Sequence, residues 1–291
     1  MEQEQIKHIN LLREAFDKYL ILYHEGALEP EDKLLDYDFD FLKNRKWHLL
    51  ADEMIQCDLR DLTNILNSWN NSLSKWHAWN QIIQKYDDME AWELRSEFLD
   101  SLVHKCLLTP ASIRDTITTI ATEAFHQVRR CFDSSYKDHL EGEPKTPEEK
   151  PKFLTRRKKE QRLFQLIQTW PNSQNFIEAL QEINSEIYIK KTRNYRNLTA
   201  HSIGPRLGIG HTRTVLRDVV PARKIEKIEG VGFEFRDVPG KISVRYSHGG
   251  YSPIDIKEAR VINLSEFEKT YRCYIEYREL LEKVVSKIER T

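Results

Sequence analysis

Three residue types that together can act on a phosphodiester lie within one short segment of the sequence. Arg196, Asn197 and His201 supply a fixed cation, a neutral donor and acceptor, and a group that exchanges a proton near neutral pH. RNA carries its own nucleophile, so cleavage needs a base for the 2′-hydroxyl, an acid for the 5′-oxygen and positive charge on the phosphorane. We expect His201 to be the base or acid, Arg196 to hold the oxyanion, and Asn197 to orient His201 or hold a phosphate oxygen.

These residues end a basic stretch, 183–205, that predicts one helix terminated by a Gly-Pro pair. At helical spacing Arg193, Asn197 and His201 lie four residues apart and share one face. Arg196 lies about 140° from His201 on an ideal helix. Its long side chain can nevertheless reach round to the same site.

The six residues from Arg196 to His201 read R-N-x-x-x-H. This resembles the R-x(4–6)-H signature, with a polar residue after the Arg, of the HEPN superfamily of helical ribonucleases. The resemblance implies an antiparallel helical bundle that dimerises, so that two copies of the motif line one RNA-cutting cleft. It further implies metal-independent cleavage without a cofactor, leaving a 2′,3′-cyclic phosphate and a 5′-hydroxyl, in antiviral defence or as a toxin.

A second R-x(4)-H match follows at Arg206 and His211. Gly208 and Gly210 interrupt it, and no polar residue follows Arg206. We interpret this match as a loop coincidence, which makes it an internal comparison for the first.

Charge is distributed unevenly along the chain. The net charge is −1, yet residues 25–61 hold eleven acids and five bases, whereas residues 188–227 hold ten bases and two acids. The basic region suits a phosphate-bearing partner, and the overall balance argues against indiscriminate coating of nucleic acid. Beside the catalytic candidates, we expect RNA contacts from Lys190, Lys191, Arg193 and Arg206. The alternative is that these side chains are simply solvated.

Neither a metal site nor a membrane segment is expected. The four cysteines lack C-x-x-C spacing, and the acids Asp36, Asp38 and Asp40 lack the glycine and distal Glu of a calcium loop. The N-terminal MEQEQIKHINLL has no uninterrupted apolar run, so we expect neither a signal peptide nor a membrane span. A cytoplasmic protein is the expectation.

Apolar periodicity predicts a mostly α protein, an antiparallel helical bundle with a small β-hairpin insertion before the last helix. The expected domains are an N-terminal helical extension, 1–45, and a HEPN-like domain, 46–291, with a linker at 140–152 and a β-containing insert at 204–262. Helices are predicted at 5–23, 47–86, 89–107, 111–136, 153–170, 183–205 and from Asn263 or Ser265 onward.

Three further features bear on the interior, on the insert and on the surface. Trp69, Trp76 and Trp79 lie in a leucine stripe, which favours core positions over a base-stacking surface. Residues 231–236 and 241–246 alternate apolar with polar around a Pro-Gly pair, which predicts a hairpin turning at 238–240. A basic run at 156–159 suits either RNA phosphates or a solvated face.

A rival function of another class uses the same basic face without cutting. A helical scaffold could hold RNA, a nucleotide or a partner protein, because a fold does not by itself carry an activity. The expected partners are RNA, a second copy of the chain, since one copy has too few proton-transfer groups, and a regulatory protein.

Overall fold

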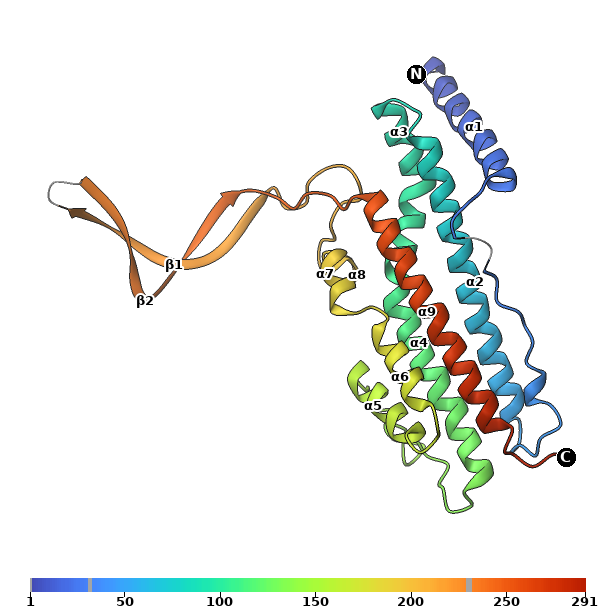
Figure 1. Cartoon of the computed structure of the whole chain (residues 1–291). Coiled ribbons are helices and arrows are strands. Elements are labelled where there is room, and N and C mark those ends of the chain that lie inside the picture. The colour runs from blue at the N-terminus through green and yellow to red at the C-terminus, as the bar shows by residue number, and fades with distance from the viewer. Residues whose placement is uncertain (1, 31–32, 229–231) are drawn as a thin grey trace. The chain divides into compact units, whose positions relative to one another are not determined.

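A computed structural model describes residues 2–30, 33–228 and 232–291 (Figure 1). It confirms a mostly helical chain with a two-stranded antiparallel sheet before the final helix. The chain divides into two units, one of Met1–Asn194 with Lys257–Thr291 and one of Tyr195–Ile256.

The helices and strands follow one another in a simple order. They are α1 (Glu2–Glu25), α2 (Ala51–Ile83), α3 (Asp88–Leu94), α4 (Asp100–Phe132), α5 (Arg156–Ile167), α6 (Ser173–Glu182), α7 (Glu186–Lys191), α8 (Tyr195–His201), β1 (Val215–Ile228), β2 (Gly232–His248) and α9 (Ile256–Val285). A 3₁₀ turn at Asp40–Leu42 precedes α2, and a π-helical segment at Arg95–Leu99 joins α3 to α4.

The core of the first unit lies where α2, α4 and α9 run side by side (Figure 1). Trp69, Trp76 and Trp79 are buried there, as the leucine stripe predicted. The ring of Tyr19 stacks on Trp79 with centroids 4.8 Å apart, which fixes α1 to α2. These aromatic rings therefore serve packing and are not accessible to bases.

Two predictions about where helices begin are wrong, one within α4 and one at the start of α9. Pro110 does not begin a new helix after Leu107, because it lies inside α4. Proline lacks the N–H that would bond the carbonyl of Cys106, four residues earlier. Asn263 of α9 supplies that bond instead, donating from Nδ2 to Cys106 O at 2.8 Å. Asn263 is therefore a buried core residue rather than the cap of the last helix, which begins at Ile256.

The segment between α1 and the 3₁₀ turn forms a strap, defined here as residues 29–30 and 33–37, along α2. The strap runs antiparallel to α2, so that successive residues of the strap contact residues progressively nearer the N-terminus of α2. Asn67 holds both the N–H and the C=O of Leu35, at 2.8 and 3.0 Å. The flanking contacts are Glu29 N to His77 Nδ1, Ser74 Oγ to Pro30 O and Tyr37 Oη to Asn64 Oδ1.

Residues 140–152 contain turns and neither helix nor strand. The next helix, α5, is shorter than the predicted 153–170. Arg156, at the start of the basic run, pairs with Asp115 at 2.7 Å and donates to Ala111 O. Arg156 is thus occupied in fixing α5 to α4.

The second unit contains a long two-stranded ribbon, defined as β1 and β2, whose strands twist about each other (Figure 1). Its register runs from Val215↔His248 to Pro221↔Ile242, shifts, and continues from Arg223↔Asp237 to the far end. The predicted turn at 238–240 is therefore wrong, because these residues form an irregularity within β2. The actual connection between the strands, 229–231, lies outside the described residues.

Candidate active site

The predicted single helix over 183–205 is broken into α7 and α8. Ser185 caps α7, accepting from Tyr188 N, and Thr192 Oγ1 bonds back to Tyr188 O at the other end. Arg193 and Asn194 then adopt left-handed φ values of 52° and 54°. Asn tolerates this conformation, whereas for Arg it costs about 1 kcal/mol or more. The Tyr188 side chain is buried and donates to Leu107 O, so α7 is fixed to α4.

This break overturns the expectation that Arg193 shares a helix face with Asn197 and His201. Arg193 lies in the connection before α8, so helical spacing does not relate it to the other two. The motif itself survives intact, because Arg196, Asn197 and His201 all lie on α8.

On α8 the two polar residues at the start of the motif contact each other. Arg196 donates from Nη1 to Asn197 Oδ1 at 2.9 Å. All three motif side chains are exposed, and His201 is the last residue of the helix. The bond directs the guanidinium toward its neighbour, which leaves other donors of its five-donor fork available for an anion.

The end of α8 is shaped by close packing. A Cβ at Gly204 would lie 2.3 Å from Thr199 Oγ1, so a larger residue at this turn would require the Thr199 side chain to move. Beyond the turn, Arg213 returns to donate from Nη2 to Ser202 Oγ at 2.7 Å. Sequence reasoning missed Arg213 as a site residue, although it lies within the basic region that the charge count identified.

The loop after α8 is organised around one buried threonine. Thr212 exchanges both backbone bonds with Tyr251, and its Oγ1 accepts from Arg206 N at 3.1 Å. Arg206 and His211 therefore lie in a loop, as predicted for the second R-x(4)-H match.

The predicted RNA-contacting residues belong to different units. Lys190 and Lys191 occupy the exposed last turn of α7, and Arg193 follows them, all in the helical unit. Arg206 belongs to the second unit with the motif. From Tyr195 to Arg217 the chain carries four arginines and no acid. Within the described residues, no carboxylate pairs with Arg196, Arg206 or Arg213.

Proton transfer at His201 has no visible orienting group. In the part of the chain that the structure describes, no hydrogen bond reaches its imidazole. No group of three His, Cys, Asp or Glu suited to a metal occurs among residues 2–30, 33–228 and 232–291. Of the acids considered for calcium, Asp38 pairs with Arg278 and Asp40 with Lys43.

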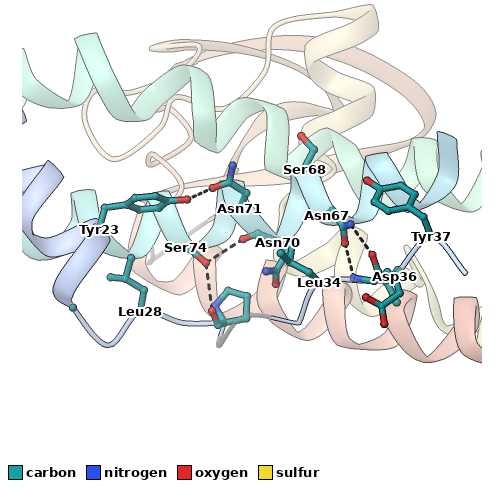
Figure 2. Close-up of a pocket in the computed structure, with 13 residues that line it drawn as sticks. Tyr23, Leu28, Leu34, Asp36, Tyr37, Asn67, Ser68, Asn70, Asn71 and Ser74 are labelled. Carbon is teal, nitrogen blue, oxygen red and sulfur yellow. Dashed lines mark hydrogen bonds between the residues drawn. The ribbon is translucent and has the colours of Figure 1, made fainter. Parts of the chain in front are cut away.

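A separate pocket of about 860 Å³ lies between the strap and α2 (Figure 2). Its described lining contains no Lys, Arg or His, so it does not suit a phosphate. Asn70 is buried there, and its Oδ1 has no partner among the described residues. Sequence reasoning missed this pocket, although asparagines at three- and four-residue steps were a visible signal. The polar lining includes Tyr23, Tyr37, Asn67, Asn70, Asn71 and Ser74.

Searches of the described helices found none long and apolar enough to cross a membrane. Comparison with protein-family models, with curated proteins and with solved structures gave no match.

Proposed function

We propose that this protein is a metal-independent endoribonuclease of HEPN type. The observation that carries the proposal is the arrangement on α8, where Arg196 contacts Asn197 and His201 ends the same helix. The absence of acids between Tyr195 and Arg217 adds support, because a carboxylate there would repel the phosphate.

In the proposed mechanism the 2′-hydroxyl of RNA attacks the adjacent phosphorus and the bond to the 5′-oxygen breaks. His201 takes the proton from the nucleophile or gives one to the leaving oxygen. Arg196 stabilises the negative charge that develops on the phosphorane, and Asn197 keeps its guanidinium oriented. Because one histidine does not serve easily as both acid and base, a second copy supplies the other His201.

One observation favours the rival function, a non-catalytic scaffold that binds RNA, a nucleotide or a protein. The imidazole of His201 has no orienting partner within the described residues. Catalytic hydrogen bonds are often completed only when substrate binds, so a direct test of cleavage separates the two functions.

The test uses purified protein, total RNA and excess chelator, with His201→Ala and Arg196→Ala as variants. Each variant should slow cleavage by ~10²–10⁴, the usual cost of losing an acid, base or charge stabiliser. The melting temperature should change little, because both side chains are exposed. Products of the wild type should carry a 2′,3′-cyclic phosphate.

The second R-x(4)-H match provides matched controls. Arg206→Ala and His211→Ala remove the same residue types from a loop in the same unit. At saturating RNA both should retain the rate of cleavage far better, because Arg206 is expected to contribute to RNA binding and not to the chemical step. If His201→Ala and Arg196→Ala cut as well as the wild type, the scaffold function replaces the nuclease.

A further inference from the structure

The ribbon has one apolar face along its first half. Cross-strand partners in an antiparallel pair point to the same side, and alternate pairs share a face. The register thus places most of the apolar side chains of this half on one side of the ribbon. Arg217 and His248 lie on the same side. Ile242 is 77% exposed and Tyr246 68%. The apolar face consists of Val215, Val219, Pro221, Ile242, Val244 and Tyr246.

The second half of the ribbon repeats this division. Ile225, Phe233 and Phe235 share one side of it and are all exposed. The ion pair between Arg223 and Asp237, at 2.9 Å, lies on that side too. Because β1 is one continuous strand, alternation places Ile225 on the same side of β1 as Val219 and Pro221. The apolar face of the ribbon therefore continues into the second half with Ile225, Phe233 and Phe235.

Much of the ribbon's charge is neutralised within the ribbon itself. On the opposite side of the first half, Arg245 pairs with Asp218 at 3.3 Å. On the opposite side of the second half, Glu226 pairs with both Lys224 and Arg236. Such paired cations hold phosphates poorly, because their charge is already balanced.

An isolated two-stranded hairpin is marginal in water unless its apolar face packs against something. We propose that the apolar face of the ribbon packs against the same face of a second copy of this chain. This inference rests on the proposed function in one respect, because the proposed nuclease also requires two copies of the chain. The ribbon would provide the surface through which the two copies bind each other.

The size of the face fits this partner. Fourteen residues of β1 at roughly 3.3 Å each give a length of about 45 Å, and two strands are about 10 Å wide. Side chains protrude, so two such faces bury on the order of 1,000 Å², the size of a small specific interface. Each copy would present the same set of apolar side chains, so the contact can be isologous, as a two-fold symmetric dimer requires.

Two other modes of pairing fit less well. Edge-to-edge pairing is disfavoured because Pro221 interrupts β1 and an irregularity at 238–240 interrupts β2. RNA stacking calls for aromatic rings beside cations that track the backbone. Here the first half of the face is mainly aliphatic.

The experiment measures molar mass by light scattering on the full chain at micromolar concentration. Val219 and Val244 are direct partners on the apolar face, so Val219→Glu with Val244→Lys replaces them by an opposite-charge pair that is compatible with the strands. The matched control, Val220→Glu with Ser243→Lys, places the same pair on the opposite face one register position away. We expect a dimer for the wild type and the control, and half that mass for the apolar-face variant.

A second apolar-face variant, Ile225→Glu with Phe235→Lys, should also be monomeric and guards against misfolding of the first. Circular dichroism checks that each variant folds. A monomeric wild type overturns the proposal, whether the face then proves to bind RNA or to be covered within its own chain. The proposal is also overturned if both apolar-face variants remain dimers, or if the control Val220→Glu with Ser243→Lys is monomeric. Mass and cleavage are measured separately, so the two proposals can fail separately. A chain that is monomeric but still cleaves RNA overturns the ribbon interface, whereas a ribbon-dependent dimer that does not cleave RNA overturns the nuclease function.

Discussion

Arg196 combines charge with a directed contact, and the two contributions can be separated. Arg196→Lys keeps the positive charge but loses the planar fork that contacts Asn197 and can hold two phosphate oxygens. We expect cleavage to fall by at least about tenfold, the lower part of the range for a lost stabilising group. Single-turnover kinetics with saturating protein measures this step. A lysine variant with wild-type rate would show that charge alone suffices.

At Asp58, the negative charge of the side chain destabilises the folded state. Burial, followed by repulsion from Asp61, raises the pKa of Asp58, and its Oδ2 has no hydrogen-bond partner in the described chain. A carboxyl with a raised folded-state pKa stabilises the fold below its unfolded pKa, about 3.9. That contribution is lost as pH rises through the higher folded value.

Asp58→Asn should therefore raise the melting temperature at pH 7, where the buried charge is costly. The gain in melting temperature should shrink as the pH is lowered into the range in which Asp58 is protonated in the folded protein. Thermal melts at both pH values test this. Asp61→Asn, at an exposed neighbour, is the control and should give a smaller gain. A lower melting temperature for Asp58→Asn at pH 7 would indicate a favourable role for the charge.

At the scale of elements, Asn263 joins three helices. It accepts from Trp69 Nε1 of α2 at 2.9 Å and donates to Cys106 O of α4 and to Tyr188 Oη of α7. Asn263→Leu would leave Trp69 Nε1 and Cys106 O unpaired, whereas Tyr188 keeps its bond to Leu107 O. The loss should cost about 2–4 kcal/mol of unfolding free energy. Urea denaturation measures the loss.

The control for this change is Asn64→Leu on α2. It removes an exposed bond with Tyr37 and should cost less than about 1 kcal/mol. Equal losses in the two variants would show that the bonds of Asn263 contribute no more than a surface contact.

The sequence predicted those elements whose signal is local and repeated. The leucine and tryptophan stripe of α2 identified a long buried helix, because its period depends only on neighbours in the chain. The continuation of α4 through Pro110 was not predictable in this way, since the missing bond is replaced by Asn263 from a distant helix. The break before α8 was not predictable from helical period either, because it lies where Arg193 and Asn194 adopt left-handed backbone conformations.

The ribbon illustrates the same limit. Its Pro-Gly signal at 238–240 is typical of a turn, whereas residues 242–246 pair with residues 217–221 of β1. Strand register depends on the partner, which local alternation does not identify. Arg196, Asn197 and His201 lie on one helix, as predicted, whereas the grouping of Arg193 with them depends on an unbroken helix that the structure does not have.

For the whole molecule, the separation of charge along the chain makes a prediction about RNA binding. Lys190→Ala with Lys191→Ala should weaken binding and reduce the slope of log affinity against log salt by about 0.7 per lost phosphate contact. The control is Lys43→Ala with Lys46→Ala, since these lysines pair with Asp40 and Glu289. Fluorescence anisotropy across a salt series measures both. An unchanged slope would mean that Lys190 and Lys191 are only solvated.

The division of the helical unit into two chain segments has a consequence for biosynthesis. Translation reaches α9 only after the whole of residues 195–256 has been made. Until then α2 and α4 lack the helix that packs beside them, and the bonds that Asn263 makes to Trp69 and Cys106 cannot form. A nascent chain must therefore keep the apolar sides of its longest helices from aggregating while the ribbon is synthesised. The core is therefore completed only after α9 has been translated, because no earlier segment of the chain takes the place of α9 beside α2 and α4.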